Sequence, residues 1–173
     1  MIDILDKLRA ESVLCEIFRN QDDADKCEVG YVVAVTDRHY LLEGVEPDGS
    51  HGGFIFGHIE DIWRIQYATQ YLNKIQKLMD KALYVPKPSP VEGRDILEEL
   101  LTYIQSAHKI SCFVLMNREQ FDYGYIKEFN GITVTFERVD AYGIPDGECV
   151  VLREDISVLT FGGADEAKLE KLV

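Results

Sequence analysis

Short apolar runs separated by turn residues dominate the chain. The segments VLCEIFR at 13–19 and ISCFVLM at 110–116 have the length of single strands, and residues 30–65 alternate apolar with polar positions between turns such as Pro47-Asp48-Gly49. Residues 71–82 instead carry apolar side chains three or four positions apart, which is the spacing of one helix face. The pattern therefore predicts a mainly β protein with flanking helices.

The same pattern occurs twice along the sequence. A shift of 94 residues aligns 30–65 with 124–159 without a gap. Outside this block, Cys15 is matched with Cys112 at an offset of 97. We interpret the chain as two copies of one unit. Nine aligned pairs are identical: Gly30/Gly124, Tyr31/Tyr125, Glu43/Glu137, Val45/Val139, Gly49/Gly143, Gly53/Gly147, Glu60/Glu154, Asp61/Asp155 and Ile62/Ile156.

Each unit is predicted to consist of a helix, a block of strands and a second helix. DILDKL at 3–8 matches DILEEL at 95–100, and Asp95 is expected to cap the second of these helices, with Glu98 completing a capping box. Between the units, the segment VPKPSPVEG holds three of the five prolines, which end the preceding helix and stiffen the backbone. We predict unit one at 1–85, a proline-rich linker at 86–93 and unit two at 94–173.

Five short strands joined by tight turns behind one helix are typical of a small barrel, because closure removes unpaired strand edges. The expected fold is therefore two tandem five-stranded barrels, each preceded and followed by a helix. The pattern resembles the Sm-like (LSM) family, within the wider set of SH3-like barrels, in its glycine-led strand at Gly30 and Gly124 and its late Glu-Asp-Ile strand at 60–62 and 154–156. The resemblance implies rings, in which the fourth strand of one barrel pairs with the fifth of the next, and single-stranded RNA bound at the pore.

The RNA-binding residues of that family are not found at the matching positions. Where the resemblance implies Asp and then Met-Asn, the chain has Asp37 and then a pair beginning with His39, and where it implies Arg-Gly, Arg153 is followed by Glu154. An acidic side chain there opposes phosphate binding. We expect the RNA site to be absent or altered. The alternative, RNA binding at an altered site, would use Arg138 and Arg153.

The net charge of −13 comes from 18 Lys and Arg against 31 Asp and Glu and is spread over both halves. A body this acidic repels phosphate backbones at long range, so nucleic-acid binding is disfavoured. No apolar stretch reaches the length of a membrane span, and the first residues lack the basic and apolar segments of a leader. We therefore expect a cytoplasmic protein without membrane contact.

Reactive side chains form no recurring arrangement along the chain. Cys15, Cys27, Cys112 and Cys149 lie far apart without a Cys-x-x-Cys pair, and the four histidines lack the spacing of metal ligands. We expect no catalytic residue, no metal and no cofactor, and therefore a protein that is not an enzyme.

The two copies differ at positions that should share one face of the sheet. Unit one has Val33, Leu41 and Phe54 where unit two has polar residues, and Trp63 is aligned with a serine. An apolar patch of this kind needs a cover, which is unit two, a helix or another chain. We hypothesise a protein-interaction or assembly module that binds a protein partner or itself, with RNA binding as the alternative. A small ligand between the barrels is a third reading that no residue pattern supports.

Overall fold

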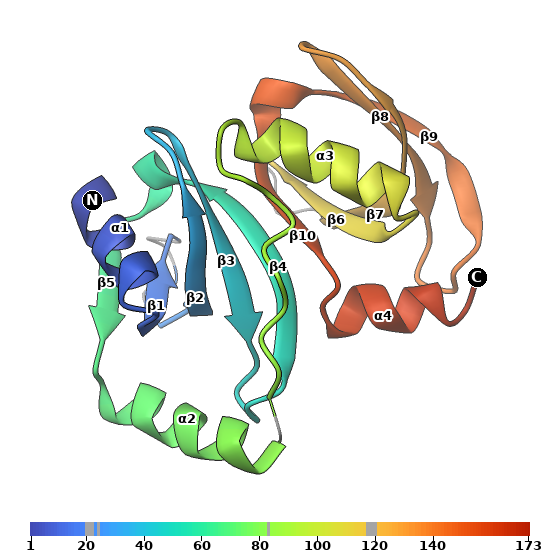
Figure 1. The fold of residues 1–173 in the computed structure, drawn as a ribbon. Coiled ribbons are helices and arrows are strands. Elements are labelled where there is room, and N and C mark those ends of the chain that lie inside the picture. Colours follow the sequence, from blue (N-terminus) through green and yellow to red (C-terminus); the bar gives the residue numbers. More distant parts are fainter. Residues whose placement is uncertain (20–22, 24, 83, 117–120) are drawn as a thin grey trace.

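The computed structural model describes residues 1–173 except 20–22, 24, 83 and 117–120 (Figure 1). The fold is mainly β with flanking helices, as the apolar pattern predicts. The first half contains α1 (Ile2–Ala10), β1 (Leu14–Phe18), β2 (Glu28–Val35), β3 (His39–Val45), β4 (His51–His58), η1 (Ile59–Asp61), β5 (Arg64–Tyr67) and α2 (Gln70–Ala82). The second half contains α3 (Ile96–Ser106), β6 (Ile110–Leu115), β7 (Phe121–Phe129), β8 (Thr133–Val139), β9 (Pro145–Leu152), η2 (Arg153–Asp155), β10 (Ile156–Phe161) and α4 (Ala164–Glu170).

The ten strands form one antiparallel sheet in the order β5-β1-β2-β3-β4-β10-β6-β7-β8-β9. The first five strands and the last five therefore follow the same internal order. Their ladders also have the same register at the 94-residue offset, since Tyr31 lies opposite Glu43 in one half and Tyr125 lies opposite Glu137 in the other. Both of these ladders slip by one residue after their third pair. The two halves thus share strand order and the register of these ladders, whereas the β6–β10 ladder has a register shift that the β1–β5 ladder lacks.

The predicted closure of each half into a barrel does not appear among the ladders of the described residues. β4 pairs with β3 along one edge and with β10 of the other half along its second edge. Because that second edge is occupied, β4 is not free to pair with β5. The sheet therefore ends at β5 and β9, which lie at opposite ends of the molecule (Figure 1).

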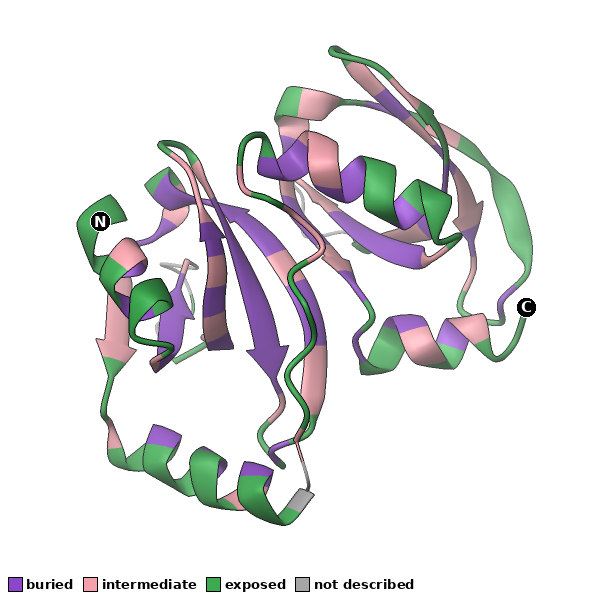
Figure 2. Cartoon of the chain, viewed as in Figure 1, coloured by how far each residue is buried: buried purple, intermediate pink, exposed green. Residues whose placement is uncertain are grey.

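Apolar side chains form three buried clusters. Strand β3, near the middle of the sheet, consists almost wholly of buried residues (Figure 2). Two of the clusters lie within the first half, one around Leu5 and Tyr40 and the other around Ile75 of α2. The third joins the halves, because Leu41 and Phe56 pack with α3 and with apolar residues of the second half. The interior is therefore shared, whereas the sequence pattern predicted a separate centre for each unit. The division at 86–93 remains a prediction.

Helix α3 begins where the sequence predicts, but its cap differs in detail. Asp95 accepts a hydrogen bond from the Glu98 N–H at 3.1 Å, as expected of an N-cap. The Asp95 N–H donates a hydrogen bond to the Glu99 carboxylate, also at 3.1 Å. The side chain of Glu98 instead accepts a hydrogen bond from Arg153. The expected capping box therefore does not form with Glu98, because an arginine from η2 binds it.

The match of Cys15 with Cys112 is wrong by one residue. Cys15 lies opposite Gly30, whereas the residue opposite Gly124 is Ser111. Both side chains make the same contact, since Cys15 Sγ donates to the Gly30 carbonyl and Ser111 Oγ to the Gly124 carbonyl, each at 3.5 Å. This position therefore holds a small buried side chain with a hydrogen-bond donor, which either a cysteine or a serine supplies.

Candidate functional site

The apolar residues that distinguish the first half lie against the second half. Leu41 is fully buried and Phe54 is 6% exposed, both in the cluster that contains α3. Val33 is partly buried against the same cluster. The second half, including its helix α3, therefore covers these residues. This is one of the three covers that the sequence left open. Leu41 and Phe54 are not available to another molecule in this conformation.

The junction between the halves is a continuous ladder with apolar side chains packed along it. Phe54 and Phe161 lie opposite each other, with ring centroids 5.3 Å apart and ring planes at 20°. Phe56 on the same strand is fully buried. Next to it, His58 Nε2 lies 2.9 Å from the Ile156 carbonyl oxygen. The junction therefore combines backbone hydrogen bonds with apolar burial, the two components of a stable strand-to-strand interface.

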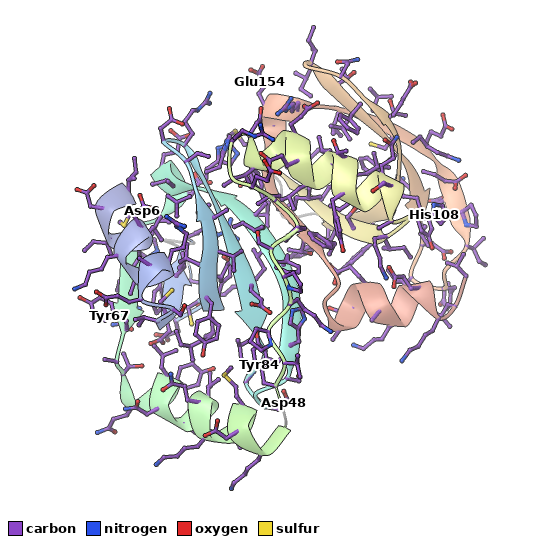
Figure 3. The ribbon with its side chains drawn as sticks, in the orientation of Figure 1. Asp6, Asp48, Tyr67, Tyr84, His108 and Glu154 are labelled. Atoms are coloured by element: carbon purple, nitrogen blue, oxygen red, sulfur yellow. The ribbon has the colours of Figure 1, made fainter. Side chains whose placement is uncertain are left out.

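The two end strands expose residues whose counterparts are buried at this junction. On β9, Val150 is 63% exposed and Leu152 is 43% exposed. On β5, Tyr67, which is labelled in Figure 3, is 47% exposed. Sequence reasoning missed these residues, although the uninterrupted apolar run at 149–152 was an available signal. Their counterparts, 94 residues away, are buried in the junction: Phe56, His58 and Phe161.

Trp63 lies next to the β5 end of the sheet. Its ring meets the ring of Phe18 at an interplanar angle of 61° and a centroid distance of 5.8 Å. The guanidinium carbon of Arg64 lies 3.7 Å from the centroid of Phe18 and 4.7 Å from that of Trp63, which is a cation–π arrangement. Among the residues predicted to form an interaction surface, Trp63 is therefore the one at an end of the sheet.

The two arginines of the RNA alternative lie on different elements and are both ion-paired. Arg153 in η2 has a side chain that is 18% exposed, and it binds the N-cap Asp95, with Nη2 2.9 Å from its carboxylate, and Glu98 in the first turn of α3. Arg138 in β8 lies 3.4 Å from Asp122 on β7 and 3.5 Å from a carboxylate on β9. Each guanidinium therefore already faces two negative charges, which compete with any phosphate.

A cavity of about 370 Å³ lies where loops of both halves meet, and its lining includes His39, His58, Arg153 and Glu154. The rings of His39 and His58 are 4.7 Å apart and perpendicular, at 89°. Burial and the neighbouring His58 and Arg38 lower the pKa of His39 to about 4. This cavity mixes charges of both signs, so it favours no single class of ligand.

We expect the His39 environment to make the protein less stable in acid. The pKa of His39 lies below its ordinary 6.5 in the folded chain, so the unfolded chain binds more protons between pH 6.5 and 4. The free energy of unfolding should fall by about 2 kcal/mol as the pH is lowered through this window, less than the full shift implies because solvent screens the half-buried ring. Denaturant titrations at several pH values should give a flatter profile for His39→Gln. Identical slopes in the two proteins would contradict this assignment.

Chemical reactivity is not evident in the described part of the chain. Burial raises the pKa of Cys15 and of Cys112 to about 12, so these thiols are not nucleophiles at neutral pH. No group of three or more His, Cys, Asp or Glu among the described residues could hold a metal ion. The described residues that line a groove of about 930 Å³ between the halves include six acidic and three basic ones. No described helix has the length and apolar character needed to cross a membrane.

Comparison with known proteins assigns no family, since no protein-family model, no curated protein and no solved structure matches the chain. Function therefore has to be inferred from the geometry of the two sheet ends and the junction.

Proposed function

We propose that the chain is a non-enzymatic protein built from two copies of an Sm-like barrel unit, and that it assembles head to tail with further copies of itself. In this assembly β9 of one molecule pairs with β5 of the next. The observation that carries the proposal is that the chain already makes this kind of junction once, between β4 and β10. The equal ladder registers of the two halves support the two-copy interpretation.

The exposed side chains at the two ends are the ones that a repeated junction would cover. At the 94-residue offset, Val150 on β9 corresponds to the buried Phe56 on β4. In the same way, Tyr67 on β5 corresponds to the buried Phe161 on β10. On the leading helices, Ile4 is 40% exposed, whereas Ile96, which has the same place in the matched segment of α3, is fully buried. Docking of one molecule's β5 end on another's β9 end would bury these side chains. Such a head-to-tail contact generates a ring or a filament.

The junction also predicts the register of the new ladder. Val158 lies opposite Gly57 and Thr160 opposite Ile55 at the junction between the halves. Transferring that register by 94 residues gives the pairs expected between molecules: Arg64 with Val151, Ile65 with Val150, Gln66 with Cys149, and Tyr67 with Glu148.

Light scattering on the purified full chain should give masses that are multiples of 19.7 kDa and rise with concentration. Val150→Lys should shift the mass toward that of a single chain, because it places a charge in the apolar part of the contact. Ile132→Lys is the matched control, since Ile132 is 70% exposed but lies in the turn before β8. A single-chain mass for the unmodified protein at every concentration would overturn the proposal.

Cross-linking tests the register separately from the affinity. Directly opposite residues in an antiparallel ladder have the Cα separation of a disulfide, so Gln66→Cys should form intermolecular disulfides with Cys149. Adding Cys149→Ser should abolish them.

The unmodified protein, once purified, also tests the RNA alternative. RNA that co-purifies with it and is released by salt, together with a single-chain mass, would favour Arg138 and Arg153 as RNA contacts instead of self-assembly.

A further inference from the structure

We propose that a cavity in the first half binds an organic ammonium ion, in which a cationic nitrogen carries an alkyl chain. The cavity has a volume of about 560 Å³, within the range of small-molecule sites. Its lining comes from β2 and β3, from Ser12 after α1, from the end of α2 and from the segment after α2 that contains Tyr84, which is labelled in Figure 3. No residue of β5 or β9 lines it, so this site is separate from the proposed assembly contacts.

The charge of the lining has one sign. Of the nine described residues that line the cavity, Glu43 and Asp80 are acidic and none is basic. Glu43 is among the most buried charged side chains of the chain, at 3% exposure. A buried carboxylate that faces a cavity whose described lining holds no Lys or Arg attracts a positively charged ligand and repels an anion.

Glu43 is held in the charged form and in a fixed place. Its carboxylate accepts a hydrogen bond from the Lys87 N–H at 2.5 Å, and His51 Nε2 lies 3.2 Å from Oε1. His51 Nδ1 accepts from the Gly53 N–H at 3.0 Å, so a neutral ring carries its proton on the side of Glu43. Burial opposes ionisation, but the contact with His51 and the hydrogen bond from Lys87 outweigh it and lower the pKa of Glu43. The Lys87 bond also fixes the segment after α2 against β3.

Two aromatic rings complete the walls. The centroids of Tyr31 and Tyr84 are 6.5 Å apart, with their planes tilted by 41°. Burial and the adjacent Glu43 raise the pKa of Tyr84, so its ring remains a neutral phenol. Ring faces attract alkylammonium groups, and Met79 and Val33 offer apolar contact for the attached chain. Carboxylates beside aromatic and apolar walls suit an organic cation better than a bare metal ion, which needs more oxygen ligands.

In the second half, the tyrosine and glutamate that correspond to Tyr31 and Glu43 have a lysine beside them. Tyr125 and Glu137 lie opposite each other as Tyr31 and Glu43 do, and Lys127 Nζ lies 3.6 Å from Glu137 Oε2. At the 94-residue offset, the place of Lys127 is taken by Val33, which lines the cavity. The first half therefore keeps the acidic partner but lacks the lysine. An external ammonium ion would occupy the position that Lys127 fills in the other half.

Titration with n-pentylammonium chloride at neutral pH, followed by calorimetry and by the NMR signals of the tyrosine rings, tests the proposal on the full chain. We expect saturable binding of n-pentylammonium, with 1-pentanol and pentanoate binding about tenfold more weakly or not at all. Equal binding of 1-pentanol and n-pentylammonium would overturn the proposal, because charge would then play no part. Absence of any response to n-pentylammonium would overturn it as well.

Val33→Lys is the decisive variant, because it places in the first half the lysine that the second half already has. Binding of n-pentylammonium should be lost, while a thermal melt should remain cooperative. Val33→Met is the matched control, since it adds a side chain of similar length without charge, and it should keep most of the binding. Tyr84→Leu provides a second test in case Val33→Lys fails to fold, and should weaken binding about tenfold. Unchanged binding in a folded Val33→Lys or Tyr84→Leu protein would contradict the assignment.

Discussion

Replacing Phe56 by alanine is expected to lower the free energy of unfolding by about 3–5 kcal/mol. Phe56 is fully buried and lies opposite Leu159 in the ladder that joins the two halves. Its ring centroid is 5.0 Å from that of His39, and its cluster includes α3 and residues of the second half. The cavity left by the ring would therefore loosen both halves together.

Denaturant titration with two probes measures this effect. Trp63 is the single tryptophan, so its fluorescence reports on the first half, whereas far-UV circular dichroism reports on the whole chain. Both signals should change at the same, lowered denaturant concentration. Val150→Ala is the matched control, because Val150 has the corresponding place on β9 but is 63% exposed, and its replacement should change stability by less than about 0.5 kcal/mol. A similar loss in both variants would contradict the closed junction.

Local patterns in the sequence predicted most of the individual elements. The helix at 71–82, the cap at Asp95 and the alternating strands all depend on residues within a few positions of one another. The duplicated pattern also placed Val33, Leu41 and Phe54 on one side of the first half and indicated that something covers them. It left open which of three covers applies, because nothing local distinguishes a helix of the same chain from another molecule.

Contacts between distant segments were beyond the reach of local patterns, although the family resemblance implied that the fourth strand of one unit pairs with the fifth of another. The pairing of β4 with β10 joins residues about a hundred positions apart, and it replaces the barrel closure that a single unit would need. The partner of Arg153 is Asp95, which is 58 positions away, so the sequence could not show that this guanidinium is already neutralised. The cavity beside Glu43 likewise depends on where the segment after α2 crosses the sheet.

Exposed and buried residues at equivalent places connect the fold with the proposed assembly. The junction buries Phe56 and Phe161, and the ends of the sheet expose Val150 and Tyr67 in their places. An unpaired strand edge with apolar side chains is a template for pairing with another strand, unless charged residues or a covering segment protect it. The net charge of −13 opposes close approach of two copies at long range, so the assembly should strengthen as salt screens this repulsion.

Replacing Gly30 by alanine is expected to destabilise the protein by about 3 kcal/mol or more. A Cβ atom at Gly30 would lie 2.2 Å from the carbonyl oxygen of Glu43 and 2.8 Å from the side chain of Leu42. The first of these is backbone on the paired strand and cannot turn aside, so β2 and β3 would have to separate where they pair. Melting temperatures and denaturant titrations should both record the loss.

The same change at Gly124 should have nearly the same effect, because a Cβ atom there would lie 2.3 Å from the Glu137 carbonyl oxygen. Gly131→Ala is the control, since nothing lies within 4 Å of the added atom, and it should alter stability by less than about 0.5 kcal/mol. Equal sensitivity at Gly30 and Gly124 would show that both halves depend on the same close approach of two strands. If Gly30→Ala were tolerated while Gly124→Ala was not, the two halves would differ in the packing that their common ladder register predicts.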